Sequence, residues 1–218
     1  ILICTLDEGI NNIPAMLLEP REGIGYIVSW QHSNDKEIAL PEELKRDDIK
    51  IYDLEGRGLS RNRNNCLRHA TANVCLISDD DSRFTHEQLQ KVIDTFAQNP
   101  DVDIATFKFE GEGSTKYYPK ESFSLTKFPK GYFVASIEIA LRRKSIQNII
   151  WFNENFGLGA EIFHCGEEHI FIQDALSHGL TCKFFPITIV RENTDSTRSN
   201  PATISAKDQI LAHDNQSL

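Results

Sequence analysis

The chain has 218 residues, of which 40% are hydrophobic and 25% charged, a composition typical of a folded globular protein and unlike that of a disordered one. This length allows one sizeable domain, or one domain with a small appendage, and such a chain can bury enough surface to fold without disulfides or a structural metal. The formal net charge is −9, from 32 acidic and 23 basic residues. Because affinity for nucleic acids comes mainly from positive charge, this balance argues against nucleic acid as a partner.

Cysteine usage and hydropathy indicate a cytoplasmic protein. The five cysteines are scattered, with no C-x-x-C pair, which predicts reduced, buried thiols. No apolar run approaches the ~18–20 residues needed to cross a bilayer, and the first residues show no basic-then-apolar pattern, so we expect no signal peptide there. The sequence starts with Ile1 directly in a strand-like run, so we expect it to be trimmed.

In the first half of the chain, predicted strands alternate with predicted helices. Apolar runs of strand length occur at 1–5, 25–31, 49–54, 74–78 and 103–109. Helical spacing occurs at 11–18, at 60–72 with Ser60 as the expected cap, and after the expected cap Thr85, where Leu89, Val92, Ile93 and Phe96 share one face. This alternation predicts an α/β domain with a mostly parallel central sheet flanked by helices.

The second half is less regular. The composition of residues 110–130 predicts a loop or hairpin excursion. We expect the aromatic residues in and just before this segment to pack internally; the alternative is that they line an acceptor groove. A strand is expected at 132–140, a short helix at 142–148, a helix at 167–178 ended by Gly179, and a last strand at 181–190. We therefore expect one domain over 1–192, with halves 1–109 and 110–192, and a polar tail over 193–218.

Three adjacent carboxylates, Asp79, Asp80 and Asp81, follow an apolar strand. Ligands of open α/β sheets bind at the carboxyl ends of strands, so these residues stand in a functional position. Their mutual repulsion predicts a divalent cation, and oxygen ligands favour Mg²⁺ or Mn²⁺. In an extended backbone Asp79 and Asp81 face the same side and would share the ion. A solvated turn that caps a helix is the alternative.

Two further segments carry polar residues next to glycines. Gly58 opens a predicted helix that contains Arg61 and Arg63, and a helix start with arginines attracts diphosphates, although a capped surface helix explains it equally well. Glu167 and Glu168 begin another predicted helix after a glycine-rich loop. A carboxylate there is placed to act as a general base, while a favourable interaction with the helix dipole alone is the simpler explanation.

In this order, the N-terminal strand ending in Thr5, GLSRNRNN, ISDDD and FGLG…GEE resemble the inverting glycosyltransferases of family 2, which have the GT-A fold, a Rossmann-like fold. The resemblance runs from Ile1 to about Glu192. It implies transfer of a sugar from a nucleoside-diphosphate sugar to a hydroxyl acceptor, a glycan or lipid-linked glycan, during polysaccharide or glycoconjugate assembly. It also implies a cytoplasmic location, with peripheral association at the inner face of the membrane left open.

The resemblance assigns roles to individual residues. Asp79–Asp81 matches the D-x-D motif that holds the metal and the diphosphate, with Asp81 the expected direct ligand. Thr5, Asp7 and Gln31 match positions that hold the base and ribose, and Arg63 matches a basic residue near the nucleotide. Glu168, with Glu167 as the alternative, matches the catalytic base.

The chain departs from the family pattern at two places. Glu167-Glu168 stands where relatives have Glu-Asp, and Arg191-Glu192 stands where many have a metal-binding histidine. Two other classes stay open. A metal-dependent hydrolase or nucleotidyltransferase would use the same acids, but the phosphate loop of the latter is missing after the first strand. A calcium-binding module would need more widely spaced acids.

Overall fold

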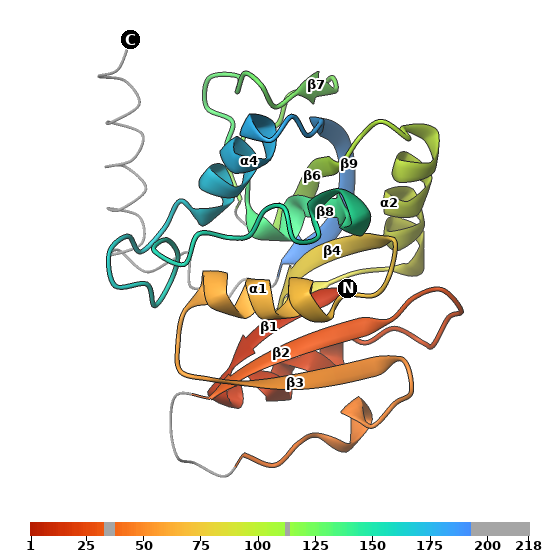
Figure 1. The fold of residues 1–218 in the computed structure, drawn as a ribbon. Coiled ribbons are helices and arrows are strands. Elements are labelled where there is room, and N and C mark those ends of the chain that lie inside the picture. The colour runs from red at the N-terminus through yellow and green to blue at the C-terminus, as the bar shows by residue number, and fades with distance from the viewer. Residues whose placement is uncertain (33–37, 112–113, 193–218) are drawn as a thin grey trace.

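One sheet organises the computed structural model, which describes residues 1–32, 38–111 and 114–192. The strand order is β3-β2-β1-β4-β8-β6-β9-β5, with β7 paired to β9 (Figure 1). The strands are β1 (Leu2–Leu6), β2 (Tyr26–His32), β3 (Ile49–Glu55), β4 (Val74–Asp79), β5 (Ser82–Arg83), β6 (Ile104–Gly111), β7 (Phe123–Ser124), β8 (Ile139–Arg142) and β9 (Cys182–Glu192). Only β5, β7 and β8 run against the others within the described part of the chain, so the prediction of a mostly parallel sheet is confirmed.

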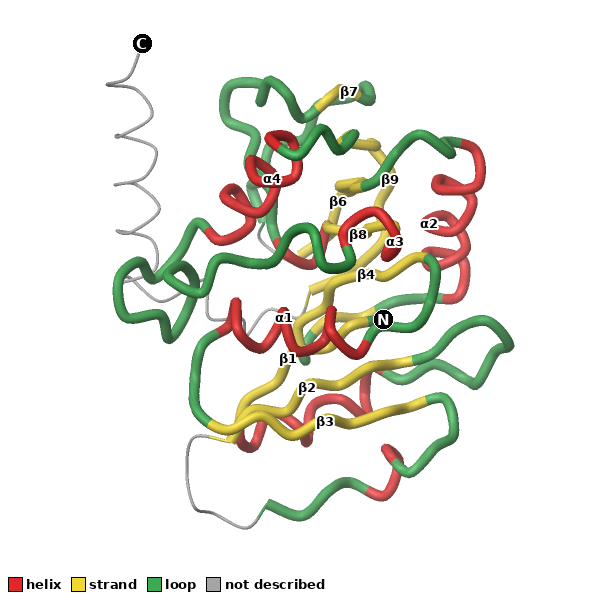
Figure 2. Tube along the Cα trace, in the orientation of Figure 1, coloured by secondary structure: helices red, strands yellow, loops and turns green. Residues whose placement is uncertain are grey.

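Helices pack on the faces of this sheet (Figure 2). The α-helices are α1 (Leu59–His69), α2 (His86–Gln98), α3 (Arg143–Ile146) and α4 (Glu167–Ser177). Three 3₁₀ segments join them: η1 (Asp7–Met16), η2 (Glu42–Leu44) and η3 (Ser136–Glu138). No helix of the described ranges is long and apolar enough to span a membrane. The predicted tail over 193–218 lies outside the described residues.

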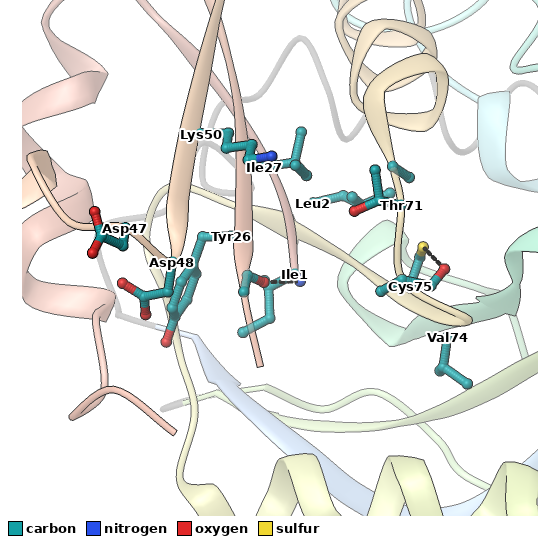
Figure 3. A pocket seen from close by; sticks show the side chains of 13 residues that line it. Ile1, Leu2, Tyr26, Ile27, Asp47, Asp48, Lys50, Thr71, Val74 and Cys75 are labelled. Atoms are coloured by element: carbon teal, nitrogen blue, oxygen red, sulfur yellow. Dashed lines mark hydrogen bonds between the residues drawn. The ribbon is translucent and has the colours of Figure 1, made fainter. Parts of the chain in front are cut away.

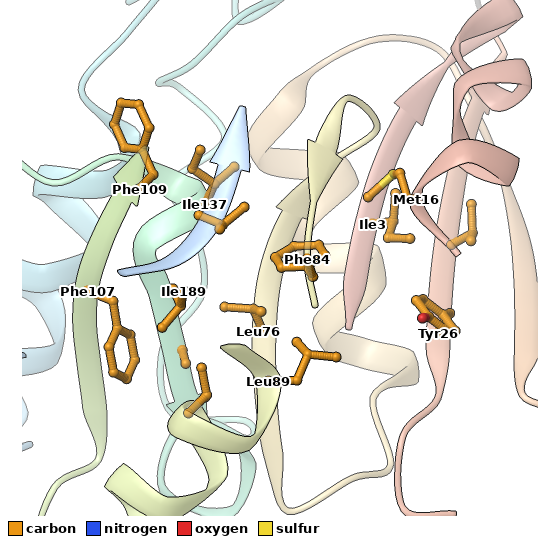
Figure 4. Packing of buried hydrophobic residues seen from close by; sticks show 14 of the residues in the cluster. Ile3, Met16, Tyr26, Leu76, Phe84, Leu89, Phe107, Phe109, Ile137 and Ile189 are labelled. Carbon is orange, nitrogen blue, oxygen red and sulfur yellow. The ribbon is translucent and has the colours of Figure 1, made fainter. Parts of the chain in front are cut away.

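The alternation of side chains along the strands divides the core into two clusters. In β1, Ile3 belongs to the cluster that η1 and α2 cover, together with Met16 and Leu89 (Figure 4). Its neighbours Leu2 and Cys4 belong to the cluster under α1 and α4. Successive side chains of a strand point to opposite faces, so one short apolar run supplies both layers. All five cysteines are buried free thiols, as predicted.

Several local predictions need correction. Residues 11–18 were expected to form a helix, but the segment is 3₁₀ from Asp7 to Met16 and contains Pro14, which has no N–H to donate. Ser60 does not cap α1; Gly58 precedes the helix, and Ser60 lies in its first turn. Thr85 does cap α2, because its side chain accepts from the Gln88 N–H in a capping box.

Other differences concern exposure and strand length. Ile93 is 41% exposed, although its spacing predicted the buried face of α2. The strand expected at 132–140 is a loop followed by η3, and β8 begins only at Ile139. Many apolar side chains of this segment, such as Tyr132, are buried although the backbone does not pair with a sheet. The sequence therefore has the apolar pattern of a strand.

The parallel strands bring the predicted site residues to one edge of the sheet. Residues in register are Leu6 with Gln31 on the β1–β2 pair and Cys4 with Asp79 on the β1–β4 pair. The carboxyl ends of these strands therefore meet beside the start of α1, which packs over β1 and β2.

Candidate active site

Arg63 is the centre of the candidate site. Its side chain is 1% exposed, and its Nη1 donates to Glu167 Oε1 at 2.9 Å and lies 3.6 Å from Glu168 Oε1. Its Nη2 lies 3.6 Å from Asp79 Oδ1. Burial acts to lower the pKa of Arg63, but the charges of Glu168, Glu167 and Asp79 hold that pKa above its ordinary value. One guanidinium thus links the end of β4 to the first turn of α4.

The two glutamates at the start of α4 have different environments. The Glu167 side chain is 6% exposed and carries the direct hydrogen bond from Arg63, whereas the Glu168 side chain is 19% exposed. Burial, with the neighbouring charge of Glu167, raises the pKa of Glu168 to about 7, although Arg63 acts to lower it. A carboxyl group with a pKa near neutrality and an accessible edge is suited to accept a proton.

The acidic turn after β4 divides its carboxylates between different partners. Thr5 Oγ1 donates to Asp80 Oδ2 at 2.5 Å, while Asp79 faces Arg63 and accepts from Ser136 Oγ at 3.4 Å. Burial raises the pKa of Asp80 to about 6; the hydrogen bond from Thr5 lowers it, and the charges of Asp79 and Asp81 raise it. The chain turns after Asp79, so the extended backbone expected through Asp81 is not present.

A divalent cation fits this turn only together with further ligands. Within the described ranges, no three His, Cys, Asp or Glu side chains converge on one point as a metal site would require. Mg²⁺-type ions are nevertheless commonly held by one or two carboxylates, with substrate phosphates and water completing the shell. The carboxylates of Asp79, Asp80 and Asp81 fit an ion held in this way, with the substrate supplying further ligands. They do not form a complete metal site by themselves.

The predicted nucleotide-binding residues lie at the ends of β1 and β2. Thr5 and Gln31 are 3% and 2% exposed, and Gln31 Nε2 is a buried donor without a protein partner in the described structure. Asp7 has φ 48°, and its carbonyl accepts from the Trp30 indole at 2.9 Å. Arg61 is exposed and donates to the Glu55 carbonyl, outside the group around Arg63.

Buried polar side chains of α1 hold the surrounding segments together. Asn62 donates to the Thr5 carbonyl at 3.0 Å, and Asn64 exchanges hydrogen bonds with the backbone of Phe152. Ser60 donates to the Phe156 carbonyl at 2.6 Å. No role was predicted from the sequence for Asn62, Asn64 or Ser136, and Ser60 was expected only as a helix cap. For α1, the run of polar residues on a short helix could have indicated buried polar contacts. For Ser136, nothing in the sequence indicated a role.

The glycine-rich loop before α4 contacts both parts of the site. The Leu59 N–H donates to the Leu158 carbonyl at 2.8 Å, so the loop docks on the start of α1. Gly157 has φ 102°, and a Cβ there would lie 3.2 Å from both the Glu167 carboxyl carbon and Ser60 Oγ. Glycine is therefore required here for its backbone conformation and for close approach.

A cavity of about 210 Å³ lies elsewhere, at the amino ends of the parallel strands (Figure 3). Its lining includes Tyr26, Asp48, Lys50, Thr71 and Cys75, and none of the predicted site residues. The clustered charges at the carboxyl ends, and not this cavity, define the candidate site, since they bring together acid, base and cation from distant segments.

Residues 5–165 match the family model described as glycosyl transferase family 2. The chain belongs to this family, which confirms the resemblance. No curated protein matches the sequence significantly.

Solved structures share the fold. Residues 1–349 of TarS from S. aureus align with a TM-score of 0.63 at 14% identity, covering 88% of this chain and 60% of that one. The same TarS segment in complex with UDP-GlcNAc gives a TM-score of 0.62 at 16% identity, covering 90% and 59%. The mannosyltransferase PcManGT from Pyrobaculum calidifontis, in complex with GDP-Man and Mn²⁺, gives 0.64 at 16% identity, covering 96% and 61%. These likenesses confirm the GT-A architecture, and the chain spans about three-fifths of each of these structures.

Proposed function

We propose that the protein is a metal-assisted glycosyltransferase that moves a hexose from a nucleoside-diphosphate sugar to a hydroxyl acceptor with inversion at the anomeric carbon. The single observation that carries this proposal is the Arg63 guanidinium, which contacts Asp79 on one side and Glu167 and Glu168 on the other. This arrangement brings the residues proposed to bind metal and diphosphate next to the proposed proton acceptor. Membership of family 2 supports the same reaction class.

Glu168 is the proposed general base. It takes the proton of the acceptor hydroxyl while that oxygen attacks the anomeric carbon from the face opposite the leaving group. The bond between this carbon and the diphosphate oxygen breaks, and the oxygen keeps the electron pair. A single displacement of this kind inverts the configuration. Glu167 has the alternative assignment, but its tighter burial and its hydrogen bond to Arg63 favour a structural role.

The donor would lie along the carboxyl ends of β1, β2 and β4. Asp79, Asp80 and Asp81 are the proposed metal and diphosphate residues, and bound Mn²⁺ or Mg²⁺ would neutralise charge on the departing nucleoside diphosphate. Thr5, Asp7 and Gln31 are proposed to hold the base and ribose. Arg61 is exposed at the start of α1, and its contact with the diphosphate stays a prediction.

Two of the similar structures contain UDP-GlcNAc, or GDP-Man with Mn²⁺, so both nucleotides are candidates for the donor. A glycan or lipid-linked glycan acceptor, a role in polysaccharide or glycoconjugate assembly, and a location in the cytoplasm or at the inner face of the membrane are predictions from the family resemblance. They extend the proposal and do not carry it.

Thermal unfolding with UDP, GDP and their sugars, each with Mn²⁺ or with EDTA, tests donor binding. A ligand at 100 times its dissociation constant adds about 2.7 kcal/mol, which raises Tm by roughly 5–10 °C for a chain of this size. We expect that shift with one nucleotide series and only when Mn²⁺ is present. Asp81→Asn should abolish it, while Asp101→Asn, at an exposed position, should not.

Other outcomes would contradict the proposal. A shift with Ca²⁺ alone and none with any nucleotide would identify a calcium-binding module. Cleavage of the nucleotide between its phosphates, with the sugar–phosphate bond intact, would identify a hydrolase.

A further inference from the structure

A second buried ion pair lies outside the proposed catalytic group. Lys116 Nζ and Glu138 Oε1 are 2.6 Å apart, and their side chains are 3% and 0% exposed. The same carboxylate oxygen accepts from the Tyr118 hydroxyl, and the other oxygen accepts from the Ala135 N–H at 2.9 Å. Both carboxylate oxygens of Glu138 are thus in use as acceptors.

Aromatic rings surround the ammonium group of Lys116. Its Nζ lies 4.2 Å from the centroid of the Phe133 ring and 5.0, 5.5 and 5.7 Å from those of Tyr118, Phe109 and Tyr132. Such faces attract a cation, and they replace part of the water that Lys116 loses. The pair is therefore well satisfied, but a buried ion pair is on average no more stabilising than apolar residues of the same volume. Stability alone is a weak reason for its presence.

The pair fixes the position of η3. By accepting from the Ala135 N–H, Glu138 closes the first turn of this segment, which packs against β4. The residue after Ala135 is Ser136, whose hydroxyl donates to Asp79 Oδ2 at 3.4 Å. The other oxygen of Asp79 faces Arg63. The Asp79 carboxylate therefore lies between a cation from the first half of the chain and a hydroxyl from the second.

We propose that Glu138, held by Lys116, is a positioning residue that sets Ser136 against Asp79 and thereby orients this carboxylate for the metal–diphosphate group of the donor. The inference rests on the proposed function, because it assigns Asp79 to donor binding. Ser136 is the contact, and the Lys116–Glu138 pair acts through it.

The test is a double-mutant cycle on nucleotide affinity. Glu138→Gln keeps the size of the side chain, but an amide has one acceptor oxygen and cannot serve Lys116 and the Ala135 N–H at once. Ser136→Ala removes only the hydroxyl. Calorimetry measures the Kd of UDP and of GDP in the presence of Mn²⁺, and the nucleotide that binds the parent more tightly is followed in the variants. Ser124→Ala and Glu121→Gln, both at exposed positions, are the matched controls.

We expect Ser136→Ala and Glu138→Gln each to raise Kd about fivefold, the size of one ordinary hydrogen bond. If both act through the same contact, the double variant also shows about a fivefold rise, whereas independent effects would multiply to about 25-fold. The controls should bind as the parent does. Should Glu138→Gln fail to fold, Tyr118→Phe, which removes one donor from the same carboxylate, replaces it in the cycle.

A lowered Tm for Glu138→Gln with the Kd of the parent would show that the Lys116–Glu138 pair is purely structural and would overturn the inference. Two other results would also overturn it: an unaltered Kd in Ser136→Ala, or a double variant in which the two increases in Kd multiply. A parent protein that binds neither nucleotide with Mn²⁺ would overturn the proposed function itself, and this inference with it. The two failures are therefore distinguishable.

Discussion

Gly157 and Glu167 are in close contact, with the α-carbon of the glycine facing the carboxyl group: a Cβ on Gly157 would lie 3.2 Å from Glu167 Cδ. The glycine-rich loop thus forms one wall around the carboxylate that pairs with Arg63. The position of Glu167 depends on the absence of a side chain ten residues earlier.

Gly157→Ala is expected to lower both stability and turnover. The φ of 102° strains any L side chain by about 1–3 kcal/mol, and the added methyl group also displaces Glu167. Gly131→Ala is the matched control, because Gly131 has φ 80° but open space around it, so it should lose stability only. Urea unfolding and the rate of nucleoside-diphosphate release from the donor are the measurements. Equal turnover in the two variants would refute a role for the contact.

Glu168→Gln is expected to reduce turnover about 10²- to 10⁴-fold without weakening donor binding, since the amide cannot accept the proton. The base must be ionised, and the pKa of Glu168 is about 7, so parent activity should fall as the pH drops through about 7. The residual activity of the Glu168→Gln variant should not fall as the pH drops through about 7. Glu161→Gln, at an exposed position in the loop before α4, is the control. A pH profile unchanged by Glu168→Gln would exclude Glu168 as the base.

The same raised pKa affects stability. Between pH 4.5 and about 7 the folded Glu168 binds more protons than the unfolded group, so its contribution to the free energy of unfolding decreases as the pH rises through this window. Glu168→Gln should remove that part of the pH dependence. Urea unfolding at several pH values measures it without any assay of catalysis.

Arg63→Met is expected to destabilise the protein by about 3–5 kcal/mol, because it leaves buried carboxylates without their cation. The loss should shrink at acid pH, where those carboxylates are protonated. Arg68→Met, on the exposed side of the same helix, removes a cation–π contact with Trp151 and should change stability by less than about 1 kcal/mol. The free energy of unfolding in urea distinguishes the two. Similar losses would mean that Arg63 does not hold the carboxylates together.

Gly9→Ala is expected to weaken the binding of Mn²⁺ with nucleotide about tenfold. A Cβ at this position would overlap the Asp80 carboxylate and lie 2.5 Å from Thr5 Oγ1, so the hydrogen bond between these two side chains must break. Gly23→Ala, where nothing lies within 4 Å, is the control. Calorimetric affinity equal to that of the parent would show that the Thr5–Asp80 contact does not matter for binding.

The sequence predicted the fold well wherever periodicity and chain order carry the signal. Short apolar runs separated by amphipathic segments specify a parallel α/β sheet, and Thr85 with Gln88 marks the start of α2. The run at 132–140 was misassigned, because burial in an irregular segment and burial in a strand produce the same apolar pattern. Ser60 was taken for a cap because serine is a common N-cap residue and stands at the start of the expected helix, while its actual partner, the Phe156 carbonyl, is far along the chain.

The site was predicted as a set of motifs, and only the structure gives their contacts. That Glu167, Glu168 and Asp79 share Arg63 depends on a salt bridge between residues 104 positions apart, which no local pattern encodes. The contact of Ser136 with Asp79 depends on the pairing of β8 with β4, which brings η3 to Asp79. Serine is too common a residue for its type to have indicated this.

The buried polar side of α1 also bears on the order of folding. Asn64 finds its backbone partners at Phe152, 88 residues later, and Arg63 finds Glu167 further still. Contacts of such separation form late, because a long loop must close before they stabilise anything. Until then, α1 would have to dock with uncompensated amides and a bare cation on its inner side. The proposed nucleotide-binding edge and the region around Glu168 thus acquire their geometry in one cooperative event, and a folding intermediate that lacks α4 should have neither.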